Sequence, residues 1–212
     1  MSVDLLWTGP ADGPVLVLAH GAGAPMDSPW METVTGLLAE RGIRVARFEF
    51  GYMAARRGGA RKPPPKAEKL IDEYREAVAE LVSRSHAPVV IGGKSMGGRV
   101  ASMVADELAA EGTVSGLVCL GYPFHPPGAP EKLRVAHLEG LTTPALIVQG
   151  TRDPLGTAEE VARYPLSGAV RVVWLEDGEH DFRPRVKLTG LTSAQHLSSA
   201  ADSTADFVRD LG

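Results

Sequence analysis

Short apolar runs rich in β-branched residues alternate along this chain with longer segments whose apolar residues recur at helical spacing. The runs span residues 15–19, 43–48, 89–91, 114–120, 145–148 and 170–175. A strand with one exposed face alternates apolar and polar residues, so runs that are apolar almost throughout indicate parallel strands covered on both faces. The alternation therefore predicts an α/β fold, with a mostly parallel sheet of about six to seven strands and helices on both faces.

The segments between these runs carry helix signals. Ser28 followed by Pro29 is typical of a helix start, and we expect that helix to reach about residue 40. An apolar stripe at spacings of three and four predicts a second helix from about residue 70 to residue 84. Further helices are expected over residues 98–111, 157–163 and 192–211. Residues 51–66, rich in glycine, proline and basic side chains, are expected to form an exposed loop.

Composition and charge favour a globular domain over a nucleic-acid-binding or membrane-spanning protein. A 44% hydrophobic content and a formal net charge of −4 predict one globular domain over residues 1–212, and the mild acidity argues against nucleic-acid binding. No apolar run reaches the roughly 18 residues of a membrane span, and the first residues lack the pattern of a secretory signal. A single cysteine, Cys119, forms no internal disulfide, so we expect a cytoplasmic protein without a membrane partner. The oligomeric state stays open.

Ser95 lies in the most informative motif of the chain. The segment Gly93-Lys94-Ser95-Met96-Gly97 follows the run at 89–91 directly, precedes an expected helix and matches the G-x-S-x-G nucleophile elbow. Glycines flank the serine because strand and helix approach each other too closely there for a Cβ atom. A phosphate-binding loop also ends in Gly-Lys-Ser, but its first glycine would fall on Pro88. We therefore interpret Ser95 as a candidate nucleophile.

A serine hydroxyl needs an imidazole base, and the imidazole needs a carboxylate that fixes its tautomer. An elbow serine on an α/β sheet is followed along the chain first by the acid and then by the histidine. His180 comes shortly after the run at 170–175, and Asp153 comes shortly after the run at 145–148. Asp177 and Asp181 are rival acids in the turn of His180 itself. The order and placement predict Ser95, Asp153 and His180 as catalytic residues.

An acyl-transfer site also needs donors for the oxyanion. We expect the amide of Met96, directly after the nucleophile, and an amide of Ala22 or Gly23, in the loop after the run at 15–19. The neighbouring His20 is expected to tie this loop down by hydrogen bonds. His86 and His196 are expected at the surface, and the two remaining histidines, His125 and His137, stay open as residues lining the site.

Two segments are candidates for substrate contacts. The loop after the run at 114–120 carries Tyr122, Phe124 and His125 among prolines, and it forms either a wall of the site or only a rigid connection. Arg56 and Arg57 belong to a basic cluster that suggests an anionic substrate if these loops share the rim, although such clusters are usually solvated. The other basic residues considered are Arg61, Lys62, Lys66, Arg183, Arg185 and Lys187.

Taken together, the motifs resemble the α/β-hydrolase superfamily. They are His20-Gly21-Ala22-Gly23-Ala24, Met26-Asp27-Ser28-Pro29, Gly93 to Arg99, Gly150-Thr151-Arg152-Asp153 and His180-Asp181. More narrowly, the chain looks like the small, lidless predicted hydrolases related to testis-expressed and chromatin-complex proteins of animals, with dienelactone-hydrolase-like relatives. The resemblance implies the α/β-hydrolase fold without a cap domain and the roles given above to Ser95, Asp153 and His180. It also implies that Lys94 is a feature of the narrower family.

The prediction is thus a metal-free serine hydrolase of the esterase type, without a cofactor, that cleaves an ester or related acyl bond of a small molecule through an acyl-enzyme. Two alternatives stay open. The fold can serve as a binding or scaffold module with an idle site. The same residues can also transfer an acyl group to an acceptor other than water.

Overall fold

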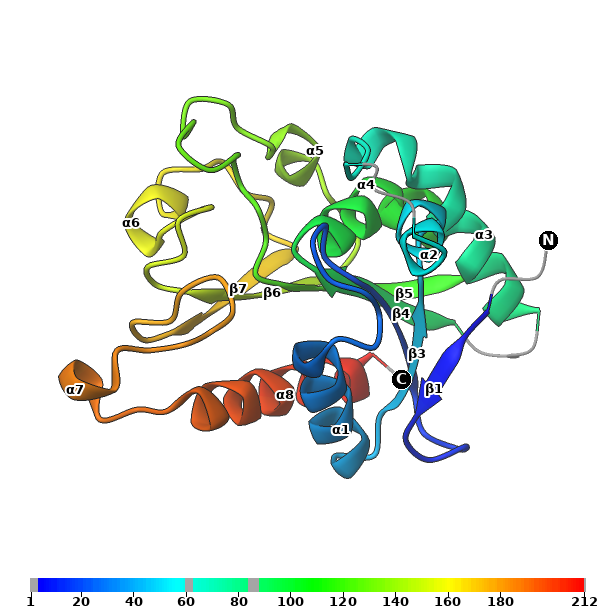
Figure 1. Ribbon diagram of the computed structural model, residues 1–212. Coiled ribbons are helices and arrows are strands. Elements are labelled where there is room, and N and C mark those ends of the chain that lie inside the picture. The colour runs from blue at the N-terminus through cyan, green and yellow to red at the C-terminus, as the bar shows by residue number, and fades with distance from the viewer. Residues whose placement is uncertain (1–3, 60–62, 84–87, 212) are drawn as a thin grey trace.

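The computed structural model describes residues 4–59, 63–83 and 88–211, and a seven-stranded sheet forms its centre (Figure 1). The strand order is β1-β3-β2-β4-β5-β6-β7, in which β1 is antiparallel to β3 and every other neighbouring pair is parallel. The strands are β1 (Leu6–Thr8), β2 (Val15–Ala19), β3 (Arg44–Phe48), β4 (Val89–Lys94), β5 (Val114–Leu120), β6 (Ala145–Gly150) and β7 (Val170–Leu175). The mostly parallel sheet predicted from the apolar runs is confirmed.

Helices cover both faces of this sheet. Helices α1 and α8 lie on one face, and α2, α3 and α4 lie on the other (Figure 1). Each face has its own buried apolar cluster. The helices are α1 (Pro29–Glu40), α2 (Gly51–Arg57), α3 (Ile71–Val82), α4 (Met96–Ala110), α5 (Ala136–Glu139), α6 (Ala158–Val161), α7 (Val186–Thr189) and α8 (Ser193–Asp210), with a 3-10 turn η1 at Ala67–Lys69. Within the described residues no segment forms a separate cap domain.

Three expectations need correction. Residues 51–57 form helix α2 instead of an exposed loop, because Met53 is buried against the core and Glu73 accepts the amide hydrogen of Gly51. Strand β1 was not expected from the pattern, since it has only three half-buried residues and depends on pairing with β3. Strand β4 extends to Lys94, three residues beyond the apolar run, because Gly92, Gly93 and Lys94 continue the ladder with β5.

The parallel sheet determines where a site can form. The carboxyl ends of β2, β4, β5, β6 and β7 lie at one edge of the sheet, so the loops that follow these strands meet there. Ser95 follows β4, Asp153 follows β6 and His180 follows β7. Among the described helices, none combines the length and the apolar character required to cross a bilayer.

Tyr74 fastens helix α3 to the strand that leads to Ser95. Its side chain is fully buried, and its hydroxyl donates to the carbonyl of Gly92 at 2.8 Å and accepts from the amide of Gly92 at 2.9 Å. Burial raises the pKa of the Tyr74 hydroxyl, so it stays protonated and able to donate. The hydroxyl thus links a face helix to the centre of the sheet.

We expect Tyr74→Phe to lower the free energy of unfolding by roughly 1–3 kcal/mol, because buried polar groups of Gly92 lose a partner. Urea denaturation followed by circular dichroism measures the change. The matched control is Tyr164→Phe, since no hydrogen bond of the Tyr164 hydroxyl is found in the described part of the chain and the side chain is only half-buried. Equal stabilities of the two variants would contradict this role of Tyr74.

Candidate active site

Ser95 occupies the sharp turn between β4 and α4. Its backbone angles are φ 51° and ψ −115°, a conformation that residues with a side chain rarely adopt. A Cβ atom at Gly97 would lie 2.5 Å from the carbonyl oxygen of Ala19, and one at Gly93 would lie 2.6 Å from the carbonyl carbon of Gly97. The turn therefore requires glycines on both sides of the serine, which matches the expected elbow.

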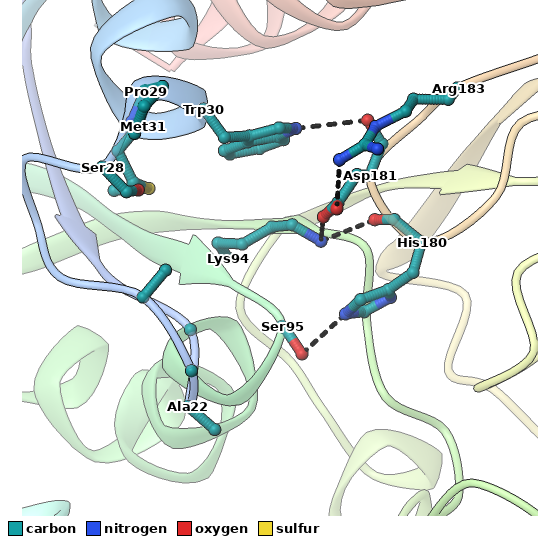
Figure 2. A pocket seen from close by; sticks show the side chains of 13 residues that line it. Ala22, Ser28, Pro29, Trp30, Met31, Lys94, Ser95, His180, Asp181 and Arg183 are labelled. Atoms are coloured by element: carbon teal, nitrogen blue, oxygen red, sulfur yellow. Dashed lines mark hydrogen bonds and ion pairs between the residues drawn. The ribbon is translucent and has the colours of Figure 1, made fainter.

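His180 lies between Ser95 and Asp153. Ser95 Oγ is 2.9 Å from His180 Nε2, and His180 Nδ1 is 2.8 Å from Asp153 Oδ2 (Figure 2 shows the first contact). The carboxylate favours the tautomer in which Nδ1–H donates to it, which leaves Nε2 to accept the serine hydroxyl proton. In this arrangement a hydroxyl can be deprotonated while it attacks a carbonyl carbon.

Asp153 is fully buried, and both of its carboxylate oxygens accept hydrogen bonds from groups other than His180. Gln149 Nε2 donates to Oδ2 at 3.0 Å, and the amide of Leu155 donates to Oδ1 at 2.9 Å. Gln149 is itself fully buried and also accepts the amide hydrogen of Tyr122 at 2.7 Å. Sequence reasoning missed Gln149, although a polar residue at the end of an otherwise apolar strand was a usable signal.

The two rival acids have other partners. Asp177 pairs with Arg152 at 3.3 Å and with Arg185, whose hydrogen bonds lower the pKa of the Asp177 carboxyl well below its usual range. Asp181 pairs with Lys94 at 3.4 Å and with Arg183 at 3.1 Å. Neither carboxylate is the one that accepts from His180 in the structure.

Lys94 connects the nucleophile strand to the loop of His180, a role that sequence reasoning missed. Its ammonium donates to the carbonyl of His180 at 2.5 Å and lies 5.1 Å from the ring centre of Trp30 and 5.7 Å from that of Phe182. Burial lowers the pKa of Lys94, and the nearby Asp181 carboxylate opposes this shift. Trp30 Nε1 in turn donates to the carbonyl of Asp181 at 3.2 Å (Figure 2). The backbone carrying the imidazole is thus held from two sides.

The expected oxyanion donors lie around Ser95. Met96 is the first residue of α4, where backbone amides have no partner within the helix, and Ala22 and Gly23 line the cavity beside Ser95. His20 is fully buried: Nδ1–H donates to the carbonyl of Gly21 at 2.7 Å, and Nε2 accepts the amide hydrogen of Phe50 at 3.2 Å. Burial lowers the pKa of His20, so the ring is neutral and ties the loop down.

Two cavities adjoin Ser95, and both are also lined by Ala22. The first has a volume of about 550 Å3 and is drawn in Figure 2. Its lining combines apolar side chains of helix α1, above all Trp30 and Met31, with His180. The second has a volume of about 810 Å3 and also touches Met96. A substrate bound at Ser95 can therefore extend in two directions.

In the loop after β5, the three residues that were expected to contact substrate, Tyr122, Phe124 and His125, line neither cavity. Tyr122 and Phe124 are fully buried, and His125 is 2% exposed. Three prolines of the same loop, Pro123, Pro126 and Pro127, line the second cavity. The loop therefore forms a wall of the second cavity through its prolines, whereas Tyr122, Phe124 and His125, which were expected to contact substrate, pack into the interior.

Arg56 and Arg57 also lie outside the lining of both cavities. Arg57 pairs with Asp27 at 2.7 Å and with Glu49 at 2.6 Å, and Arg56 stacks over the ring of Tyr52. The expected substrate contacts of these two arginines are corrected, because acidic neighbours neutralise Arg57 and an aromatic ring occupies Arg56. Arg61 and Lys62, which belonged to the same cluster, lie outside the described residues.

Two further histidines, His196 and His137, have hydrogen-bond partners other than Ser95 and Asp153. His196 is 4% exposed instead of at the surface, because Nδ1–H donates to the carbonyl of Phe182 at 2.9 Å and so fixes the segment after His180 to α8. His137 bonds to the hydroxyl of Ser102 at 2.8 Å. His86 lies outside the described residues.

No three His, Cys, Asp or Glu side chains come together as metal ligands would in the described part of the chain. Burial raises the pKa of the Cys119 thiol, which donates to the carbonyl of Gly98 at 3.4 Å and is fully buried. Cys119 is therefore a core residue, as expected.

Gly97→Ala should lower the free energy of unfolding by about 1–3 kcal/mol, because the added methyl group would force the start of α4 away from the end of β2. The control is Gly36→Ala in α1, where a Cβ meets nothing within 4 Å and alanine should stabilise the helix by about 0.5–1 kcal/mol. Thermal or urea denaturation measures both. The elbow argument fails if Gly97→Ala is tolerated as well as Gly36→Ala.

Comparison with known proteins identifies a family and several similar structures for this chain. A model of the family described as alpha/beta hydrolase domain matches residues 12–209. A dienelactone hydrolase from Anabaena variabilis is similar in structure, with a TM-score of 0.73, 21% identity and coverage of 98% of this chain and 92% of that one. A serine hydrolase without a lid from Xanthomonas campestris has a TM-score of 0.71, 18% identity and coverage of 98% and 88%.

A thermophilic esterase from Thermogutta terrifontis has a TM-score of 0.68, 17% identity and coverage of 99% and 93%. At these identities the structural likeness shows a shared fold. The expected relation to testis-expressed and chromatin-complex proteins of animals stays a prediction. The match of the family model over nearly the whole chain shows more: this protein belongs to the alpha/beta hydrolase family, and its described residues have the fold of that family without a cap domain.

Proposed function

We propose that this protein is a serine hydrolase that cleaves an ester or related acyl bond of a small molecule. The observation that carries the proposal is the hydrogen-bonded series from Ser95 through His180 to the buried Asp153, located where an α/β sheet places its ligands. Membership in a hydrolase family supports the reaction class. The single, buried cysteine favours a location in the cytoplasm.

The reaction proceeds in two halves. As Ser95 Oγ bonds to the carbonyl carbon, its proton passes to His180 Nε2 and the carbonyl π electrons move onto oxygen. The amides of Met96 and of Ala22 or Gly23 hold this oxyanion. Collapse breaks the bond to the leaving group, which takes the proton from His180, and an acyl-serine remains. Water then repeats the sequence and releases the acid.

Asp153 and Lys94 act through His180. The Asp153 carboxylate fixes the imidazole tautomer and stabilises the imidazolium that forms in each half-reaction. Lys94 holds the backbone carbonyl of the same histidine at 2.5 Å, so it is a positioning residue. Asp153 holds the ring of His180 and Lys94 holds its backbone, so Nε2 stays within reach of Ser95.

The first test is covalent labelling by a fluorophosphonate, which reacts with activated serines. We expect the native protein to be labelled and to hydrolyse short-chain esters, and Ser95→Ala to lose both properties with its fold intact, because the reacting oxygen is gone. Ser199→Ala, on the exposed side of α8, is the control and should label normally. Gel fluorescence and circular dichroism provide the two readouts.

Other results of the labelling test would distinguish the proposed hydrolase from its alternatives. Labelling that persists in Ser95→Ala refutes Ser95 as the nucleophile. A native protein that is neither labelled nor active refutes the hydrolase and favours the scaffold alternative. Labelling without ester hydrolysis, restored by adding an alcohol or thiol acceptor, favours acyl transfer.

The second test concerns Lys94. Lys94→Met keeps the length of the side chain between Trp30 and Phe182 but removes the donor to His180, so we expect kcat to fall about tenfold with little change in KM, as for a group that acts in the transition state. Lys94→Arg should recover part of kcat. Lys187→Met, at an exposed position, is the control. A change confined to stability, with kcat as in the native protein, would contradict the positioning role.

A further inference from the structure

The second cavity beside Ser95 has a lining of unusual charge. Four of its side chains are basic, Lys66, Arg99, Lys132 and Arg134, whereas one, Glu68, is acidic. The chain as a whole has 22 basic and 26 acidic residues, so this lining reverses the overall balance. The remaining lining is apolar or small and consists largely of prolines of two loops.

Most of this positive charge is not compensated inside the protein. Glu68 Oε1 accepts from Arg99 at 2.6 Å, which leaves no second acid among the lining residues. In the described part of the chain, Lys66, Lys132 and Arg134 take part in no ion pair. Burial is the largest cause that lowers the pKa of Arg134, and the repulsion by Arg99 adds to it and outweighs the attraction of Glu68. An anion entering the cavity would relieve that repulsion.

The first cavity is different. Its two basic side chains, Lys94 and Arg183, both pair with Asp181, at 3.4 Å and 3.1 Å, and Arg183 also lies 3.9 Å from the carboxylate of Glu179. Trp30 and Met31 supply much of the remaining surface. An uncharged or apolar group therefore fits the first cavity, and a charged group fits the second.

The position of His180 indicates which cavity takes the leaving group and which takes the acyl chain of the substrate. The leaving group must receive a proton from His180 Nε2, and His180 lines the first cavity together with Ser95. The described lining of the second cavity contains Ser95, Met96 and Ala22 but not His180. The leaving group thus extends into the first cavity, and the acyl chain extends into the second.

We propose that the second cavity binds a carboxylate on the acyl chain, so that the substrate is a half-ester of a dicarboxylic acid, or a related acyl compound, with an uncharged leaving group. This inference rests on the proposed hydrolase function. Lys132 and Arg134, on the loop after β5, supply the contacts to the carboxylate, and Lys66 adds to the local field. The anionic substrate suggested by the sequence is retained, but the cations that bind it differ from Arg56 and Arg57.

The test compares three esters of matched size, of which the first two share one uncharged alcohol. One has a neutral acyl chain, one has an acyl chain of similar length ending in a carboxylate, and a third has the carboxylate on the alcohol side. We expect kcat/KM to be highest for the acyl carboxylate. The double variant Lys132→Gln/Arg134→Gln should reduce that preference over the neutral ester about tenfold, since it removes partly exposed charge-assisted contacts. Salt at about 0.5 M should weaken the native preference.

The control is the double variant Arg163→Gln/Lys187→Gln, which removes the same charge from exposed positions outside both cavities and should keep the native preference. Equal kcat/KM for neutral and carboxylated acyl chains overturns the inference while leaving the hydrolase in place. Preference for the carboxylate on the alcohol side also overturns it, because the two cavities would then have the opposite roles.

A binding readout separates the inference from the proposed function. Calorimetric titration of Ser95→Ala with the carboxylated and neutral esters needs no turnover. We expect tighter binding of the acyl carboxylate, and loss of this difference when the Lys132 and Arg134 changes are added. Binding without labelling of the native protein would refute the hydrolase and keep the anion site, and no difference in binding refutes the anion site.

Discussion

The close approach of β4 and α4 to the end of β2 is the constraint on which the site depends. At Gly97 a methyl group would lie 2.5 Å from a carbonyl oxygen of β2, and at Gly98 one would lie 2.7 Å from the carbonyl oxygen of Gly93. This contact forces Ser95 into φ 51°, the region in which its side chain projects from the turn. The loop after β2 also lies beside Ser95, since Ala22 lines both cavities with it.

Buried polar groups extend this constraint to His180. Asp153 has no exposure and is supported by Gln149, and Lys94, which lines the first cavity, donates to the His180 carbonyl. Breaking such a buried pair costs more than forming it contributes, so these groups specify one arrangement of the loops more than they add stability. The elbow and the His180 loop are therefore held to each other, with Lys94 next to Ser95 in the chain and next to His180 in space.

Sequence reasoning succeeded where local pattern and topology agree. The apolar runs predicted six of the seven strands, because parallel strands buried on both faces show a continuous apolar signal. It failed at β1 and α2, whose stability comes from pairing with β3 and from the contact of Gly51 with Glu73. It left open whether the loop of Tyr122 and Phe124 contacts substrate, since aromatic residues among prolines look alike whether they face a cavity or the core, and the structure buries both side chains.

The sequence by itself determined the strand order along the chain, the glycines of the elbow and the chain order of Ser95, Asp153 and His180. Only the tertiary structure decided which cations are free of acidic partners: Arg57 is paired with Asp27 and Glu49, whereas Arg134 is not paired within the described residues. Charge compensation is a matter of distances between residues far apart in the chain, and a sequence gives charges without those distances.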